Sequence, residues 1–283
     1  MKRPAFVLAY LAPAVVLYFL FVGWPLLQAF ALSTFKWSGL SDQKTFVGAG
    51  NYEKLARDDV FRQSVSHNLW LLVVCGVAIL VLAVGLAHAL QQKGRLAASL
   101  RSLFLFPHVM SLVAVSIMWR FIFDPTPGGL LNGVLGHQTD WLGRKATALP
   151  AVGTAFVWYS VGFYVMLFMA GLRQIDAEVI EAASLDGAYG WRRFRTITWP
   201  LLWSIKRISI IYLVINVLNI FALVWVMTSG GPDRATETIL TYLYQVGIGQ
   251  SKFGYASAVA VVNFALVMAL SGVVGLMFRR RHA

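Results

Sequence analysis

Long apolar stretches alternate with short polar ones along the whole chain. A helix needs about 20 mostly apolar residues to cross a bilayer. Stretches of that length cover residues 6–34, 68–90, 103–123, 148–171, 201–228 and 255–278. Their apolar residues do not alternate strictly with polar ones, as they would in the lipid-facing strands of a barrel. The pattern predicts an all-α polytopic membrane protein, in which six transmembrane helices form one domain over residues 1–283.

The composition supports this prediction. The chain is 58% hydrophobic and 13% charged, whereas soluble domains are roughly 45–50% apolar and about 25% charged. The apolar stretches leave no room for a large soluble domain. A net charge of +12 raises the question of nucleic-acid binding, but the distribution of lysine and arginine along the chain is better explained by membrane orientation.

Basic residues concentrate in the segments on one side of the predicted membrane. If the N-terminus faces the cytoplasm, the cytoplasmic side carries 14 basic and four acidic residues, and the other side carries ten basic and eight acidic residues. Cytoplasmic loops carry the excess of lysine and arginine. Both termini and the loops around 91–102 and 172–200 are therefore predicted to be cytoplasmic. The 14 basic residues are Lys2, Arg3, Lys93, Arg95, Arg101, Arg173, Arg192, Arg193, Arg195, Lys206, Arg207 and Arg279 to Arg281.

The first apolar stretch is too long for a cleaved secretory signal. Signal sequences have apolar cores of about 7–15 residues, and this stretch continues for nearly thirty. We expect it to remain as a transmembrane helix.

Three residues inside the predicted spans are interpreted as structural. Cys75, the one cysteine of the chain, has no disulfide partner within the chain and fits a small buried hydrophobic position. Pro107 and His108 predict a kink in the third span, with the histidine hydrogen-bonded within the protein.

The polar stretch EAASLDGAYGWRRFRTITWPLL, residues 181–202, lies between two apolar stretches and divides into two short elements. The first is predicted to be a helix over 177–186. Asp176 is a favourable N-cap for it, and Gly187 is well placed to end it.

The second element carries Trp191, Phe194 and Ile197 at a spacing of three residues, with arginines between them. This pattern favours the membrane interface, with the rings facing inward and the arginines outward. Pro200 falls where the next apolar stretch begins, a position at which its missing N–H costs least. Amphipathicity alone leaves two interpretations open, a connector that rests on the membrane and a docking element for another protein.

The stretch matches a known motif in register. The motif reads E-A-A, three residues, G, nine residues, I, one residue and L-P, and the chain matches it at Glu181, Ala182, Ala183, Gly187, Ile197 and Pro200. Trp199 stands in place of the leucine. Such agreement at fixed spacing is a specific signal. The loop, residues 172–200, therefore resembles the EAA loop of permease subunits of ATP-binding-cassette importers.

The resemblance extends over nearly the whole chain and indicates the carbohydrate branch, typified by the maltose and glycerol-phosphate permeases. It is carried by LAPAVVLYFLFVGWPLLQAFALSTF and FVGAGNYEKL near the N-terminus, and by TSGGPDRATETILTYLYQ and FGYASAVAV near the C-terminus. The loop at 36–67 is too short to hold the large outer domain of the maltose permease.

This resemblance implies a fold, a location and a set of partners. The fold is that of a type I importer permease in the inner or plasma membrane of a bacterium or archaeon, where the chain forms half of the translocation pathway for a sugar. The implied partners are a second homologous permease subunit, two ATP-binding-cassette ATPase subunits, an external substrate-binding protein and the lipid bilayer, with no nucleic acid.

The resemblance also implies a coupling helix that docks into a groove of the ATPase. In that role Glu181 would accept hydrogen bonds from the ATPase, Ala182 and Ala183 would permit close packing, and Gly187 would fix the exit angle. Asp186 completes the implied coupling residues.

Motifs for catalysis are missing from the sequence. It holds no H-E-x-x-H, G-x-S-x-G or Walker A motif, and its histidines lack metal-ligand spacing. We therefore expect no catalytic residue, metal or cofactor, with ATP hydrolysed by another chain. The predicted spans contain no Asp or Glu, which argues against a proton relay but leaves sodium coupling open. Two alternatives to a sugar-importer permease stay open, namely a permease of the same superfamily for a polyol or amino acid, and a stand-alone secondary transporter.

Polar side chains in the last two predicted spans are candidates for the substrate pathway. Tyr212, Asn216 and Asn219 lie at i, i+4 and i+7, on one face of a helix, and Asn263 lies in the final span. These residues either line the pathway or form hydrogen bonds between helices. The sequence leaves both interpretations open.

Overall fold

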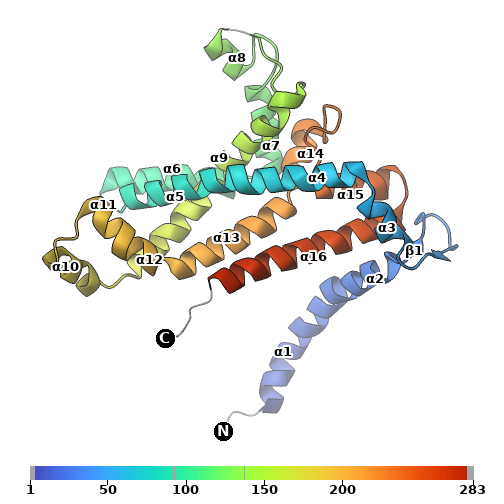
Figure 1. The fold of residues 1–283 in the computed structure, drawn as a ribbon, viewed down its shortest axis with the longest axis horizontal. Helices are drawn as coiled ribbons and strands as arrows, with labels where there is room; N and C mark the ends of the chain where they lie inside the picture. Colours follow the sequence, from blue (N-terminus) through green and yellow to red (C-terminus); the bar gives the residue numbers. More distant parts are fainter. Residues whose placement is uncertain (1–3, 92–93, 137, 279–283) are drawn as a thin grey trace. The chain divides into compact units, whose positions relative to one another are not determined.

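The computed structural model describes residues 4–91, 94–136 and 138–278. Within these residues the chain is almost entirely helical, with one short antiparallel hairpin (Figure 1). The hairpin pairs β1 (Phe35–Lys36) with β2 (Thr45–Phe46). The predicted cytoplasmic location of the termini rests on residues that lie outside the described part of the chain, namely Lys2, Arg3 and Arg279 to Arg281, and the same holds for Lys93.

The remaining elements are helices. In the first half of the chain they are α1 (Pro4–Tyr18), α2 (Trp24–Leu32), α3 (Gly50–Ala56), α4 (Asp59–Trp70), α5 (Gly76–Ala89), α6 (Arg95–Val109), α7 (Leu112–Ile122) and α8 (Leu130–Leu135). In the second half they are α9 (Lys145–Arg173), α10 (Ala177–Leu185), α11 (Gly190–Arg193), α12 (Trp199–Leu201), α13 (Trp203–Leu218), α14 (Ala222–Thr228), α15 (Ile239–Tyr244) and α16 (Phe253–Met277). Short π-helical turns continue several of them, namely η1 (Phe19–Gly23), η2 (Leu71–Cys75), η3 (Phe194–Thr198) and η4 (Gln245–Gly249).

Several helices are long and apolar enough to cross a membrane. The unbroken ones are Tyr10–Leu32, Asp59–Ala89, Lys145–Arg173 and Phe253–Met277. The bent pairs are Ala98–Val109 with Leu112–Ile122, at 100°, and Gly190–Leu201 with Trp203–Leu218, at 69°. The predicted all-α class with several apolar spans is confirmed, and the number of spans reaches six when each bent pair counts as one span.

Two predicted spans are broken rather than straight. The stretch 103–123 leaves the helical conformation at Met110 and Ser111, whose ψ angles are 153° and 130°. This bend follows Pro107, as the sequence predicted. The stretch 201–228 is interrupted between α13 and α14. Hydropathy does not detect these breaks because apolar residues continue on both sides of them.

The described residues divide into two compact units. The first contains residues up to 61 together with 242–265. In this unit the start of α16 is tied to the segment after β1, since the Gly254 N–H donates to the Trp37 carbonyl at 3.1 Å. The Phe253 ring also packs against the Trp37 ring, with centroids 6.0 Å apart.

Asp58 is a second anchor in the first unit. Its carboxylate caps α4 by accepting hydrogen bonds from the N–H groups of Val60 and Phe61. It also accepts hydrogen bonds from the hydroxyls of Tyr242 and Tyr255, at 2.5 and 2.6 Å. Burial by itself would raise the pKa of Asp58, but these four donors hold that pKa below its usual value.

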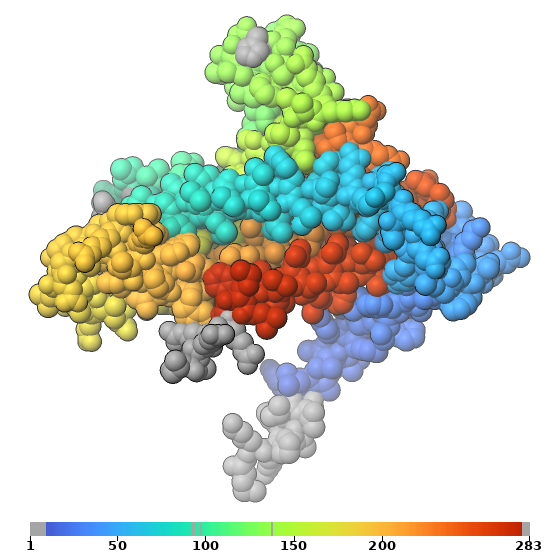
Figure 2. All heavy atoms as spheres, in the orientation of Figure 1, coloured from blue at the N-terminus to red at the C-terminus, as the bar shows by residue number. Residues whose placement is uncertain are grey.

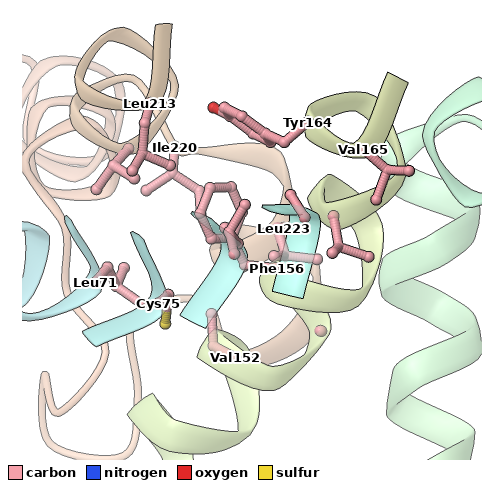
Figure 3. Packing of buried hydrophobic residues seen from close by; sticks show 14 of the residues in the cluster. Leu71, Cys75, Val152, Phe156, Tyr164, Val165, Leu213, Ile220 and Leu223 are labelled. Atoms are coloured by element: carbon pink, nitrogen blue, oxygen red, sulfur yellow. The ribbon is translucent and has the colours of Figure 1, made fainter. Parts of the chain in front are cut away.

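The second unit, residues 62–241 with the end of α16, is built around α9. Both α5 and α6 pack along α9, while α7 packs against α14 (Figure 1). Cys75 is buried in this core, as predicted. Figure 3 shows side chains of η2, α9, α13 and α14 packed together, among them Leu71, Val152, Phe156, Tyr164, Val165, Leu213 and Leu223.

Candidate functional site

A cleft of about 360 Å³ lies in the second unit, at the point where α13 gives way to α14. Tyr212, Asn216 and Asn219 line it together, as expected for residues on one helical face. Asn263 belongs to the first unit and is not among the lining residues. Its place in the pathway stays a prediction. The other lining residues are His108, Leu112, Phe156, Tyr159, Ser160, Tyr164, Ile220, Phe221, Ala222 and Leu223.

The break between α13 and α14 exposes backbone carbonyls that need donors inside a membrane. Side chains supply them. The Asn68 amide donates to the Val217 carbonyl at 2.6 Å, and the Thr238 hydroxyl donates to the Ile220 carbonyl at 3.2 Å. The irregular backbone that carries Asn219 into the cleft is therefore held by defined hydrogen bonds.

These donors belong to a buried cluster of Asn68, Glu237, Thr238 and Thr241, which we call the polar latch. All four residues are 0% exposed. Asn68 Oδ1 accepts a hydrogen bond from the Ile239 N–H at 2.9 Å, and the Thr241 hydroxyl donates to Glu237 Oε1 at 2.6 Å. The sequence did not predict this cluster, because a carboxylate in a segment rich in glycine and proline carries no signal of burial.

The asparagine amides in the cleft are oriented by their own helix. Asn216 donates to the Tyr212 carbonyl and Asn219 to the Ile215 carbonyl, both at 2.8 Å. An amide carries two N–H donors and one acceptor oxygen. Each local bond therefore orients its side chain.

Two buried atoms in the cleft have no hydrogen-bond partner among the described residues, His108 Nδ1 and the Tyr164 hydroxyl. Buried polar atoms are almost always hydrogen-bonded, so these two mark positions for a ligand or an ordered water. The His108 side chain is hydrogen-bonded to the Tyr159 backbone, as predicted, although Nδ1 has no partner among the described residues. Its ring lies between Tyr159 and Phe163, with centroids 4.9 and 5.0 Å away, and these rings offer π faces instead of acceptors.

The cleft combines aromatic rings with uncharged polar groups. The Tyr212 ring lies 4.7 Å from Phe163 and 6.2 Å from Tyr164. The described residues that line the cleft include no Asp, Glu, Lys or Arg. Such a lining suits a neutral ligand with many hydroxyl groups. The contributions of α6 and α9 were not predicted, although the polar pair Tyr159 and Ser160 inside an apolar span was a usable signal.

The loop that follows α9 contains the second candidate site. α10 ends one residue earlier than predicted, and Gly187, at a φ of +71°, ends it in the left-handed conformation that glycine favours. The Ala188 N–H closes the end by donating to the Ala183 carbonyl at 2.9 Å. Asp176 occupies the N-cap position as predicted, but its side chain makes no capping hydrogen bond.

The exposed face of α10 differs from the predicted one in one respect. Glu181, Ala182 and Asp186 are exposed, but Ala183 is only 4% exposed and packs within the chain. Leu185 is 90% exposed and lies four residues after Glu181, on the same face. This leucine was not among the predicted coupling residues. Figure 2 shows the yellow segment that contains α10 uncovered at the surface.

Comparisons with known proteins agree with this architecture. Residues 79–282 match the family described as binding-protein-dependent transport system inner membrane component. The diacetylchitobiose uptake system permease protein NgcF of Streptomyces coelicolor is 36% identical, covering 98% of this chain and 83% of that protein. The multiple sugar-binding transport system permease protein MsmF of Streptococcus mutans is 30% identical, covering 91% of this chain and 90% of that protein.

A solved structure has the same fold. The crystal structure of a bacterial ABC transporter that imports the acidic polysaccharide alginate contains a chain with a TM-score of 0.85. The match covers 100% of this chain and 98% of that one at 18% sequence identity. Because the family match covers well over half of the sequence, the chain belongs to the family of binding-protein-dependent transport system inner membrane components.

Proposed function

We propose that this chain is the membrane-spanning subunit of an ATP-driven sugar importer and forms half of its translocation pathway. The cleft at the α13–α14 break carries this proposal, because it presents amides, tyrosines and a histidine without a charged side chain among its described lining residues. Relatives named for the uptake of diacetylchitobiose and of multiple sugars support the same substrate class.

The chemistry of the cleft fits a sugar that must bind and then leave. A hydroxyl group that leaves water loses hydrogen bonds worth several kcal/mol in an apolar medium. Asn216, Asn219 and the Tyr164 hydroxyl offer replacements, while Tyr212 offers a ring for the apolar face of the sugar. Broken helices at the centre of the membrane are a recurring way to build such sites.

We further propose that α10 couples transport to a separate ATPase subunit. Glu181 and Leu185 are both exposed on one face of α10, and such a face suits a helix-in-groove contact. In this assignment Ala182, Asp186 and Gly187 surround the contact, whereas Ala183 stabilises α10 from within. We also propose that both termini lie in the cytoplasm, on the side of α10, and that a second permease subunit and an external binding protein complete the importer.

Tyr164→Phe tests the substrate site. The hydroxyl has no protein partner among the described residues, so its removal should leave thermal stability within about 0.5 kcal/mol of wild type. Uptake of a labelled oligosaccharide should fall several-fold. Asn219→Leu should also lower uptake. If Asn263→Leu lowers uptake in an assembled complex, Asn263 belongs to the pathway as well. Tyr18→Phe, at an exposed tyrosine outside both the cleft and the 172–200 loop, is the matched control. Full uptake by Tyr164→Phe and Asn219→Leu in an assembled complex would remove the cleft from the pathway.

Glu181→Lys tests the coupling site. Reversal of this exposed charge should leave the chain inserted in the membrane but weaken ATPase attachment, because a charge reversal at a docking contact adds repulsion. Gly187→Pro should do the same by altering the end of α10. Co-purification of the ATPase and uptake are the measurements, with Glu53→Lys in α3 as the control. Normal uptake by both α10 variants contradicts the assignment.

A further inference from the structure

The segment after α10 has a character opposite to that of α10. Residues 190–207 contain five basic residues and three tryptophans but no acidic residue, whereas α10 contains no basic residue. The segment forms two limbs, Gly190–Leu201 and Trp203–Leu218, that meet at 69°. If the second limb crosses the membrane, an angle of this size lays the first limb close to the plane of the membrane surface.

The first limb carries a row of aromatic rings. Trp191 stacks on Phe194 with centroids 5.3 Å apart, and Phe194 lies 6.0 Å from Trp199. Trp191 is 73% exposed in this chain. Tryptophan is enriched at the boundary between lipid and water, where an amphipathic ring is most stable. The row of rings is therefore suited to a position at the depth of the lipid headgroups.

Two cations are held against tryptophan rings where the second limb begins. The Lys206 ammonium lies 4.2 Å from the centre of the Trp199 ring and donates to the Trp199 carbonyl at 2.8 Å. The Arg207 guanidinium lies 5.2 Å from the centre of the Trp203 ring. Each contact is a cation–π interaction that fixes the position of the charge.

The direction of the Lys206 side chain is typical of a lysine at the membrane surface. Lys206 lies inside α13, yet it reaches back past the start of that helix to a residue seven positions earlier. Lysines near the ends of membrane spans extend in this way so that the ammonium reaches the headgroup region. Of the three ammonium hydrogens, the carbonyl of Trp199 takes one, which leaves donors for an anionic oxygen.

We infer that Lys206, Arg207 and the tryptophans beside them form a binding site for the phosphate headgroup of an anionic phospholipid. Arg192, Arg193 and Arg195 extend the positive surface along the first limb. Clusters of basic residues beside a membrane span attract anionic lipid. The inference needs only that this end of α13 meets a bilayer surface, so it stands whether or not the cleft carries a sugar.

Native mass spectrometry of the purified full-length chain tests the site. The chain is exposed to equal amounts of phosphatidylglycerol and phosphatidylcholine with identical acyl chains, and the wild type should retain phosphatidylglycerol preferentially. Lys206→Gln with Arg207→Gln should reduce this preference, by about fivefold for each cation removed. The charge-conserving pair Lys206→Arg with Arg207→Lys should keep most of it.

The matched control removes two other cations that lie over aromatic rings, Lys44 over Trp37 and Lys54 over Tyr255. Lys44→Gln with Lys54→Gln should leave the preference unchanged, and excess glycerol phosphate should not displace the lipid. An unchanged preference in the Lys206 and Arg207 double variant would overturn the inference. So would an equal loss in the control, which would reflect net charge alone. If the double variant keeps its lipid preference but no longer co-purifies with the ATPase when the assembled importer is isolated, these cations form a protein contact instead.

Discussion

Helices α9 and α16 are similar in length and apolar character, but the chain uses them differently. The membrane-spanning window of α9 has a mean hydropathy of 1.7 and is 56% buried, whereas that of α16 has a mean hydropathy of 2.3 and is 11% buried. The more hydrophobic helix is thus the more exposed one. Hydropathy reports transfer into lipid, and it does not report packing against other helices.

The glycines of the two helices explain the difference. Gly153, Gly162 and Gly171 recur in α9 every nine residues, and an added Cβ at each would collide with a neighbouring element. In α16 such a close approach occurs at Gly254, at the beginning of the helix, whereas at Gly272 and Gly275, near its end, an added Cβ would meet nothing within 4 Å. Small residues allow close helix approach inside membranes. Close approach, more than apolar character, therefore determines which helix forms the core.

Gly162→Val should have the largest effect on this comparison. The added side chain would overlap with the carbonyl oxygen of Phe104 in α6, a backbone atom that cannot turn away. We expect a loss of stability of about 3 kcal/mol or more, measured as thermal unfolding in detergent. Gly272→Val in α16 is the control and should stay within about 0.5 kcal/mol of wild type. Equal behaviour of the two variants would break the comparison.

Asn68→Leu should have the next largest effect, because it tests whether the core around α9 is held by shape alone. Leucine has a similar volume but leaves the Ile239 N–H without its partner, and it removes the side-chain donor from the Val217 carbonyl, which keeps only its bond from the Ile220 N–H at 3.3 Å. The expected loss of stability is about 2 kcal/mol. If the polar latch positions the α13–α14 break, the substrate concentration for half-maximal uptake should also rise. Ser66→Ala, an exposed position in α4 with a local hydrogen bond, is the control. Wild-type stability in Asn68→Leu would mean that packing alone holds the break.

Asp58→Asn should have the smallest effect and tests how α16 is held at its beginning. The asparagine still caps α4, but the bonds from Tyr242 and Tyr255 lose the charge of their acceptor, at a cost of about 1 kcal/mol. Because folding lowers the pKa of Asp58, the carboxylate stabilises the fold above the unfolded pKa and loses this effect as pH falls through the folded pKa.

The stability difference between wild type and Asp58→Asn should therefore shrink from about pH 7 to about pH 3. Chemical unfolding in detergent at both values is the measurement. Tyr10→Phe, which changes an exposed tyrosine, is a control for the loss of a single polar group. A difference that is constant with pH would show that Asp58 does not hold α16 through its charge.

Local patterns predicted much of the candidate site. The helical spacing of Tyr212, Asn216 and Asn219 brought them to one cleft, because the first two lie in α13 and the third is the C-cap of that helix. His108 and Tyr164 were not predicted, since their place opposite these residues depends on how α6 and α9 pack. The burial of Ala183 and the exposure of Leu185 likewise depend on how α10 packs, which its sequence does not report.

The sequence by itself determined the class of this protein and the position of the polar loop along the chain. Apolar stretches of spanning length, the spacing from Glu181 to Pro200 and the helix end at Gly187 are local features, and local chemistry is sufficient to specify them. Only the tertiary structure decided which helix became the core, where α13 breaks and that Glu237 is buried. Each of these depends on contacts between residues far apart in the chain, such as Asn68 with Val217 and Gly162 with Phe104. The free energy of such contacts comes from close packing and hydrogen bonds between helices, which no local pattern of hydropathy records.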